Sequence, residues 1–325
     1  MEPLLKVKDL KIGFSTEFGL LRAVDGVSFE VARREKFGII GESGCGKSVT
    51  ALGIMRLIPS PPGKILSGEI IFDGKNLLEL DAESMRRIRG KRISMIFQEP
   101  VISLNPVFTV GSQIAEVFRV HEGLSRKEAF ERAVEMLKLV QIPDPERRAR
   151  EYPHQLSGGM CQRVMIAMAL ALSPDLLIAD EPTTALDVTI QAQILELINE
   201  LVEKMNMSLI LITHDLGVIA EVVERVMVMY TGLIMEMAST NELFSNPLHP
   251  YTQGLMEAMP GRGLQACAGK KQELYTIPGL VPSPLDLPPG CPFQDRCPKA
   301  KEHCKEKRPK LREISPNHWV RCYEV

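Results

Sequence analysis

The sequence predicts an α/β fold with a helical insertion and a C-terminal extension of different composition. Strand-length apolar runs at residues 37–40, 176–179 and 209–213 alternate with segments of helical spacing, which is typical of a parallel sheet covered by helices. The interval 103–152 has apolar positions at helical spacing and indicates helices inserted between the two halves of this core. The predicted boundaries are residues 1–238 for the α/β domain, about 99–156 for the insertion within it, and 239–325 for the extension.

The composition is that of an ordinary globular protein. Of the 325 residues, 45% are hydrophobic and 25% are charged, and the net charge of −2 gives no reason to expect a nucleic-acid partner. Residues 1–10 are too charged for a secretory signal, and the longest uncharged apolar run, Val164–Leu172, is about half the length of a membrane span. Seven cysteines without an export signal favour free thiols or metal ligands over disulfides.

Residues 1–36 alternate apolar and polar positions and predict short antiparallel strands joined by turns. Phe14 lies among these strands, where its ring can either stack on an adenine base or pack in the core. The residues alone leave both roles open.

Residues 41–48, Gly-Glu-Ser-Gly-Cys-Gly-Lys-Ser, form a predicted phosphate-binding loop. They follow the apolar run 37–40 and precede a predicted helix at 49–58, which is the context that such a loop requires. Glycines let several backbone N–H groups point at one anion, Lys47 adds a positive charge, and the Ser48 hydroxyl can bind Mg²⁺. The predicted nucleotide contacts of this segment are Gly41, Ser43, Gly44, Cys45, Gly46, Lys47, Ser48 and Val49.

Two carboxylates, Asp180 and Glu181, follow the buried strand at 176–179. Ligands of open α/β sheets lie at the carboxyl ends of strands, so Asp180 is placed to hold Mg²⁺ opposite Ser48. Glu181 is placed to accept a proton from an attacking water molecule. The alternative is a solvated acidic strand end, which the phosphate loop upstream disfavours.

Two further segments carry candidate phosphate contacts. Ser157, Gly158 and Gly159 precede an apolar helix, and a hydroxyl with backbone N–H groups at a helix N-terminus is a second anion-binding arrangement. The same residues also suit an ordinary N-cap with a flexible turn. His214 follows the strand at 209–213, where a γ-phosphate contact is favoured over a purely structural role.

Two segments of the chain are rich in proline. Prolines occur repeatedly in residues 246–251 and 277–290, which predicts extended, linker-like chain.

Cys45 lies beside Lys47 and a predicted helix N-terminus, and these neighbours are expected to lower the pKa of its thiol.

The C-terminal segment has four cysteines but little apolar content, so a metal centre is expected to hold it together. The four are Cys291, Cys297, Cys304 and Cys322. Their spacing lacks the close pairs of structural zinc sites, while iron–sulfur clusters accept wider intervals. Zinc and free thiols are the alternatives, and His303 or His318 can replace a cysteine as ligand.

The motifs resemble, in order, those of the nucleotide-binding subunits of ATP-binding cassette (ABC) transporters. They are the phosphate loop, Gln98, residues 156–160, Asp180–Glu181, Asp187 and His214. The resemblance covers residues 1 to about 238 and implies a P-loop ABC ATPase core. Such a core has a RecA-like mixed sheet, an antiparallel β subdomain and an inserted helical subdomain, and it binds ATP and Mg²⁺.

The resemblance also implies roles for individual residues. Phe14 is similar to the aromatic that stacks on adenine, and Gln98 to the residue that links Mg²⁺ and the attacking water to the membrane partner. The 157–159 turn is similar to the signature that binds the γ-phosphate of a nucleotide held by the opposite subunit of a head-to-tail pair. The implied catalytic residues are Glu181, His214, Gln98 and Lys47, the implied Mg²⁺ ligands are Ser48, Gln98 and Asp180, and Asp187 is a further nucleotide contact.

The C-terminal region resembles the extension of dipeptide and oligopeptide permease ATPases, in particular the D-type subunits. The resemblance rests on residues 249–252, His-Pro-Tyr-Thr, and on residues 290–293, Gly-Cys-Pro-Phe. Met160, which stands where ABC proteins usually have glutamine, is familiar in the same group. The resemblance implies a peripheral subunit at the cytoplasmic face that hydrolyses ATP to power import of dipeptides or oligopeptides. Some members of this group carry a [4Fe–4S] cluster on the tail cysteines.

The implied partners follow from the same resemblance. They are a second ABC ATPase subunit, identical or different, two membrane-spanning permease subunits and an extracytoplasmic peptide-binding protein, with no nucleic acid. The alternative functions are a soluble ABC-type ATPase with a redox-sensing iron–sulfur tail, and an ABC importer for nickel or another small solute.

Overall fold

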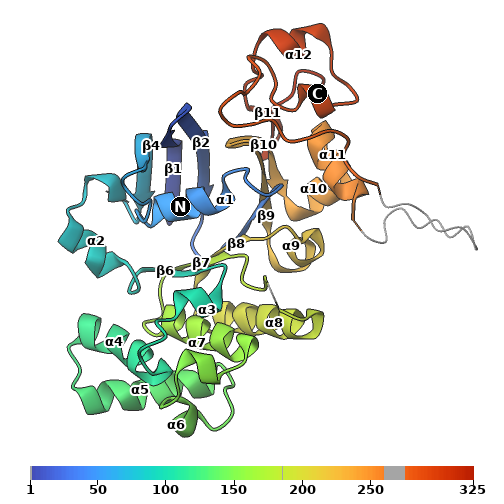
Figure 1. The fold of residues 1–325 in the computed structure, drawn as a ribbon. Coiled ribbons are helices and arrows are strands. Elements are labelled where there is room, and N and C mark those ends of the chain that lie inside the picture. Colours follow the sequence, from blue (N-terminus) through green and yellow to red (C-terminus); the bar gives the residue numbers. More distant parts are fainter. Residues whose placement is uncertain (1, 185, 260–274) are drawn as a thin grey trace, which may run out of the picture. The chain divides into compact units, whose positions relative to one another are not determined.

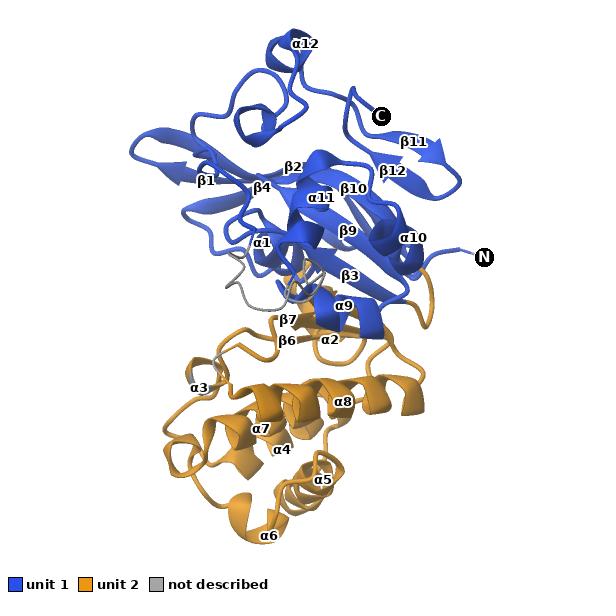
Figure 2. Ribbon diagram, turned by 90° about the vertical axis from the view of Figure 1, so that its right-hand side faces the viewer, with its two compact units in different colours: residues 1–31, 36–78, 213–325 blue, residues 32–35, 79–212 orange. Residues whose placement is uncertain are grey.

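The computed structural model describes residues 2–184, 186–259 and 275–325, and the chain divides into two compact units. Unit 1 comprises residues 1–31, 36–78 and 213–325, and unit 2 comprises residues 32–35 and 79–212 (Figure 2). Each unit therefore draws on segments that are far apart in the sequence, whose order along the chain Figure 1 shows by colour.

Unit 1 contains an antiparallel sheet with the strand order β2-β1-β4-β5. The strands are β1 (Leu5–Thr16), β2 (Gly19–Val31), β4 (Gly63–Phe72) and β5 (Lys75–Asn76). The predicted antiparallel pairing is confirmed, but the prediction of short strands is wrong, because β1 and β2 run for 12 and 13 residues. Irregularities near Asp9 and Gly13 are absorbed as register shifts within β1 and do not become turns.

A second group of strands in unit 1 includes residues near the C-terminus. β3 (Lys36–Ile40) is parallel to β9 (Arg225–Tyr230), and β9 is antiparallel to β10 (Leu233–Ser239). β12 (His318–Val320) pairs with β10, and β11 (Arg312–Ser315) pairs with β12. The C-terminal region is therefore part of the same sheet as β3, the strand that leads into the phosphate loop.

The helices of unit 1 are short. They are α1 (Lys47–Ile54), α9 (Leu216–Val222), α10 (Thr240–Ser245), α11 (Pro250–Glu257) and α12 (Glu302–Glu306), with a 3-10 turn η3 at Gln294–Arg296. The expectation of extended chain is wrong at residues 250–251, since the His249 side chain caps α11 by accepting a hydrogen bond from the Tyr251 N–H. Residues 277–290 form no helix or strand, as predicted.

Unit 2 combines a parallel sheet with the inserted helices. β6 (Ile93–Ile96), β7 (Leu176–Asp180) and β8 (Ser208–Ile212) are parallel, and every residue of these strands is buried. The helices are α2 (Ala82–Ile88), α3 (Pro100–Ser103), α4 (Val110–Glu122), α5 (Arg126–Leu139), α6 (Pro145–Arg148), α7 (Gly158–Leu170) and α8 (Val188–Lys204). α3 to α6 lie between β6 and α7 in the sequence, and α4 packs against α5.

The predicted α/β fold with inserted helices is confirmed by these elements. The domain boundaries at residues 238, 99 and 156 stay predictions, and the described residues from 213 onward cluster with unit 1. Among the helices of the described ranges, none is both long enough and apolar enough to cross a bilayer.

Candidate functional site

The phosphate loop in unit 1 connects β3 to α1 along a path that needs glycine. Gly41, Gly44 and Gly46 have φ angles of 149°, 78° and 101°, in the region that side chains rarely adopt. A Cβ at Gly41 would lie 2.2 Å from the Met229 carbonyl oxygen, and one at Gly46 would lie 2.4 Å from that of Ala23. Close packing on the neighbouring backbone therefore fixes the course of the loop.

Lys47 begins α1 and turns its ammonium group back onto the loop. Its Nζ donates to the carbonyl oxygens of Gly41, at 2.8 Å, and Glu42, at 3.1 Å. The side chain is only 5% exposed, so these carbonyls satisfy a charge that is almost entirely out of water. Phosphate oxygens can take the place of these acceptors with a stronger, charge-assisted hydrogen bond.

Cys45 does not have the lowered pKa that its neighbours suggest. Its side chain is buried, and burial raises the pKa of the thiol, although Lys47 acts in the opposite direction with its Nζ 3.8 Å from the sulfur. The prediction of a lowered pKa for Cys45 is therefore wrong, because desolvation of the thiolate outweighs the attraction of one ammonium group.

We expect Cys45 to be alkylated at neutral pH at least about a hundredfold more slowly in the folded chain than in the denatured chain, because the thiol is both buried and protonated. Peptide mapping of iodoacetamide-treated protein measures this rate. Rapid labelling that nucleotide suppresses would contradict the raised pKa.

In unit 2, β7 presents Asp180 and Glu181 at its carboxyl end. Asp180 is 4% exposed, and Glu181 has a φ of 46°, a left-handed conformation that is uncommon for a side chain of this kind. The Glu181 N–H donates to the Ile212 carbonyl, at 2.8 Å, which holds this bend on the end of β8. Unusual backbone that neighbouring strands enforce is typical of functional positions.

Gln98 and Glu181 lie together in unit 2. Gln98 Nε2 donates to Glu181 Oε2 at 2.9 Å, and Thr184 Oγ1 donates to the same oxygen at 3.0 Å. Two donors thus orient the Glu181 carboxylate, one from a residue before β7 in the sequence and one from a residue after it. Two segments that were predicted separately to take part in catalysis are joined by a direct hydrogen bond.

Two glutamines that the sequence analysis did not single out hold the loop after β7. The buried Gln162 donates from Nε2 to the Pro182 carbonyl at 2.6 Å. Gln191 donates from Nε2 to the carbonyls of Thr183 and Leu186, both at 3.1 Å. The only sequence signal for Gln162 is a polar residue within the apolar helix α7.

Ser157 is the N-cap of α7, and its Oγ accepts a hydrogen bond from the Met160 N–H at 3.3 Å. Ser157 and Gly158 are exposed, and Gly159 is half-buried, so the positive end of this helix faces outward. The capping role and the anion-binding role therefore suit the same turn. Asp187, which precedes α8, is also exposed.

The remaining predicted residues of unit 1 are His214 and Phe14. His214 is exposed just before α9, whose N-terminus is capped by Asp215. Phe14 is half-buried in β1, and a Cβ at Gly63 would lie 2.8 Å from its Cε1, so the ring packs against that glycine. Ser48 and Val49, at the start of α1, are half-buried.

The four C-terminal cysteines line one pocket of unit 1. Cys291, Cys304 and Cys322 are buried, and Cys297 is partly exposed. Burial raises the pKa of Cys291 to about 11, and the other three cysteines act in the same direction. Because metal ligation requires thiolates, an ion or cluster at this site has to displace these protons.

The described cysteine sulfurs are not gathered as closely as the ligands of one zinc ion. Ligands of a single tetrahedral zinc would lie about 3.8 Å apart, given a Zn–S bond near 2.3 Å. In the described part of the chain, no three of the four cysteine sulfurs lie within 4.8 Å of one another. A cluster spreads its thiolates more widely, because each one binds a different iron atom.

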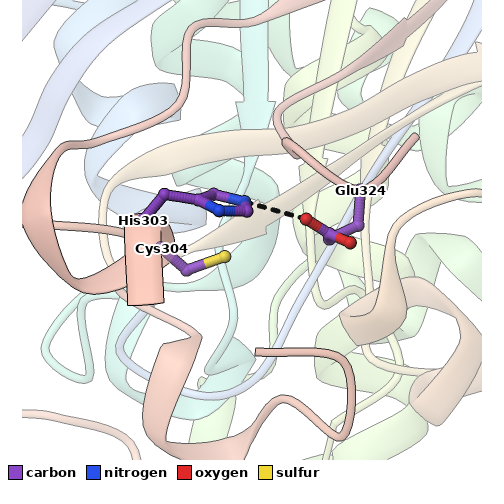
Figure 3. A group of neighbouring side chains, drawn as sticks. All are labelled: His303, Cys304 and Glu324. Carbon is purple, nitrogen blue, oxygen red and sulfur yellow. Dashed lines mark ion pairs between the residues drawn. The ribbon is translucent and has the colours of Figure 1, made fainter. Parts of the chain in front are cut away.

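One smaller group of possible metal ligands includes Cys304. The ligand atoms of His303, Cys304 and Glu324 lie within 4.8 Å of one another (Figure 3), and His303 Nε2 is 2.8 Å from Glu324 Oε1. His318 is differently placed, since its Nε2 lies 2.7 Å from Oε1 of the buried Glu236. His303 is therefore a better replacement ligand than His318.

Comparison with known proteins places this arrangement in a family. The ABC transporter family model matches residues 24–184, and the model of the oligopeptide/dipeptide transporter C-terminal region matches residues 235–304. The probable peptide ABC transporter ATP-binding protein y4tR of Sinorhizobium fredii is 56% identical over 98% of this chain and 94% of its own. The dipeptide transport ATP-binding protein DppD of Bacillus subtilis is 50% identical over 99% of this chain and 95% of its own.

A solved structure agrees with these matches. The dimeric ATP-binding cassette MJ0796, in a post-hydrolysis state bound to ADP and Pi, gives a TM-score of 0.65 at 30% identity, over 73% of this chain and 98% of that chain. The fold and the phosphate loop thus define an ATPase of the ABC class. Within that class, the chain belongs to the family of transporter ATP-binding proteins with the oligopeptide/dipeptide transporter C-terminal region, as predicted.

Proposed function

We propose that this chain is the ATP-hydrolysing subunit of an ABC importer for dipeptides or oligopeptides, bound peripherally at the cytoplasmic face of the membrane. The match over 235–304 to the oligopeptide/dipeptide transporter C-terminal region carries this proposal. Relatives named for peptide transport match the chain over nearly their whole length, which supports it.

The phosphate loop and Lys47 hold the nucleotide phosphates, with Phe14 against the adenine. Ser48, Asp180 and Gln98 would hold Mg²⁺, since hydroxyl, carboxylate and amide oxygens are the donors that this cation prefers, and burial constrains the Asp180 carboxylate. Mg²⁺ supplies charge neutralisation at the phosphates when it is bound. Lys47 and His214 add positive or hydrogen-bonding groups around the transferred phosphoryl group.

Glu181 acts as the general base in this proposal. Its carboxylate accepts a proton from the attacking water, while the hydrogen bonds from Gln98 and Thr184 fix its direction. Because Gln98 contacts Glu181 directly, movement of the segment after β6 changes the orientation of the base. That contact gives a physical route by which a membrane partner near Gln98 controls hydrolysis.

The working unit is a head-to-tail pair with a second ATPase subunit, identical or different. The 157–159 turn of this chain, whose Ser157 and Gly158 are exposed, contacts the γ-phosphate held by the neighbouring subunit, and Asp187 lies at the same interface. ATP then joins the two subunits, and hydrolysis releases them. This motion is passed to two membrane-spanning permease subunits, which receive peptide from an extracytoplasmic binding protein.

Purification of the intact complex from membranes, followed by identification of the ligand on its binding protein, tests the proposal. Co-purification with two permease subunits and recovery of peptides support it. Recovery of nickel or another small solute would identify that solute, in place of peptide, as the transported cargo. An ATPase without membrane partners, whose activity follows the state of an iron–sulfur centre, would overturn the transport role.

We also propose that the four cysteines hold a [4Fe–4S] cluster. We expect anaerobically purified protein to be coloured and to contain iron and sulfide, and Cys304→Ser to lose most of the iron. Cys161→Ser is the matched control, because Cys161 is buried in α7 and lies outside this group. A colourless protein that contains zinc would contradict the cluster.

A further inference from the structure

The phosphate loop contains one acidic residue, Glu42, although its ligand is negatively charged. Glu42 follows Gly41 in the loop, and an unpaired carboxylate here would repel a triphosphate. The structure pairs it instead with Arg296 from the C-terminal region, through two hydrogen bonds of 2.6 and 2.9 Å. Arg296 therefore neutralises the one negative charge within the loop.

The backbone of Glu42 is held as firmly as its side chain. Its N–H donates to Tyr251 Oη at 2.9 Å, and its carbonyl accepts from Lys47 Nζ at 3.1 Å. Tyr251 is fully buried and stacks at an angle on Tyr230, with ring centroids 4.7 Å apart. Two residues of the C-terminal region, Tyr251 and Arg296, thus fix the position of one loop residue.

Arg296 is fully satisfied at this position. Besides Glu42, its guanidinium group donates to the carbonyls of Pro278 and Ile277 and to Tyr230 Oη, so that all of its N–H groups have acceptors. The side chain is only 6% exposed. Removal of Glu42 alone would leave the nearly buried guanidinium charge without its partner. Removal of Arg296 alone would leave the Glu42 carboxylate, 26% exposed, unpaired within the loop that binds phosphates.

The backbone that carries Arg296 belongs to the four-cysteine segment. Arg296 ends the η3 turn, which lies between Cys291 and Cys297. The Gln294 N–H donates to the Cys291 carbonyl, and the Cys297 N–H donates to the Gln294 carbonyl. The conformation of this turn therefore sets the positions of Cys291, Cys297 and the guanidinium group of Arg296.

We propose that Arg296 is a positioning residue for the nucleotide site, which acts through Glu42 and makes ATP affinity depend on the conformation of the four-cysteine segment. By reciprocity, bound nucleotide stabilises that segment. The inference needs the nucleotide site but not a particular transported solute, so it stands or falls separately from the peptide-import role.

The test compares MgATP dissociation constants of full-length Arg296→Gln, Glu42→Gln and the double variant. We expect Arg296→Gln to weaken binding about tenfold, because the Glu42 charge is left without its partner near the phosphates. We expect the double variant to bind within about threefold of Glu42→Gln alone, since the unpaired charge is gone. A purely structural role of Arg296 predicts no such rescue, so equal weakening in both backgrounds would overturn the proposal.

Two further variants complete the test. Lys8→Gln is the matched control, because Lys8 makes a 2.9 Å ion pair with Glu69 across β1 and β4, outside both the phosphate loop and the four-cysteine segment; its MgATP affinity should stay at the wild-type value. Cys297→Ser should weaken MgATP binding severalfold in the wild-type background and not in the Glu42→Gln background. The same loss in both backgrounds would show that the cysteines do not act through this ion pair.

Discussion

Glu181→Gln is expected to keep MgATP binding and to slow hydrolysis by about two to four orders of magnitude, the usual contribution of a general base. The glutamine amide has nearly the same shape as the carboxylate, and its oxygen can still accept from Gln98 and Thr184. It cannot accept the proton of the attacking water. This variant should therefore retain MgATP binding while its rate of ATP hydrolysis falls.

Steady-state hydrolysis by the assembled complex and equilibrium binding of MgATP measure the two effects. Glu200→Gln is the matched control, since Glu200 is an exposed carboxylate on α8 in the same unit. We expect this control to hydrolyse ATP at the wild-type rate. Wild-type hydrolysis by Glu181→Gln would refute the assignment of the base.

Gly158→Asp is expected to abolish productive pairing of the ATPase subunits. The structure has room for the side chain, because a Cβ at Gly158 would lie 3.7 Å from its nearest neighbour, on Leu186. A carboxylate at the start of α7 also interacts favourably with the helix dipole, so the chain should fold. The same carboxylate repels a γ-phosphate held by the neighbouring subunit, and we expect hydrolysis there to fall by about a hundredfold or more.

Analytical size-exclusion of nucleotide-loaded subunits and ATPase assays measure this effect. Binding of MgATP to the phosphate loop of the variant itself should be unchanged, because that loop is a different segment of the chain. Gly158→Ala, which adds the Cβ without the charge, should retain most of the activity. Wild-type pairing and turnover in Gly158→Asp would argue that this turn does not meet a phosphate.

The phosphate loop and the ends of the buried strands could be predicted because their signals are local. Glycines 41, 44 and 46 sit where the backbone needs positive φ, and the apolar run of β7 ends directly in Asp180. The signature turn could be located for the same reason, since a serine before two glycines and an apolar helix lies within one short segment.

Features that depend on tertiary contacts could not be predicted in this way. Glu42 and Arg296 are separated by 254 positions, and neither has a sequence neighbour that indicates the other. The pKa of Cys45 was predicted in the wrong direction, because burial of the thiol depends on how the loop packs and is not visible from Lys47 beside it. β12 likewise depends on pairing with β10, a strand far from it in the sequence, and β11 in turn pairs with β12.

The most direct test of the account is a structure of the assembled complex with Glu181→Gln, loaded with MgATP. The account predicts that Ser157 Oγ lies within hydrogen-bond distance, about 2.7–3.2 Å, of the γ-phosphate held by the neighbouring subunit. A nucleotide-loaded complex in which the 157–159 turn lies remote from every γ-phosphate would contradict it.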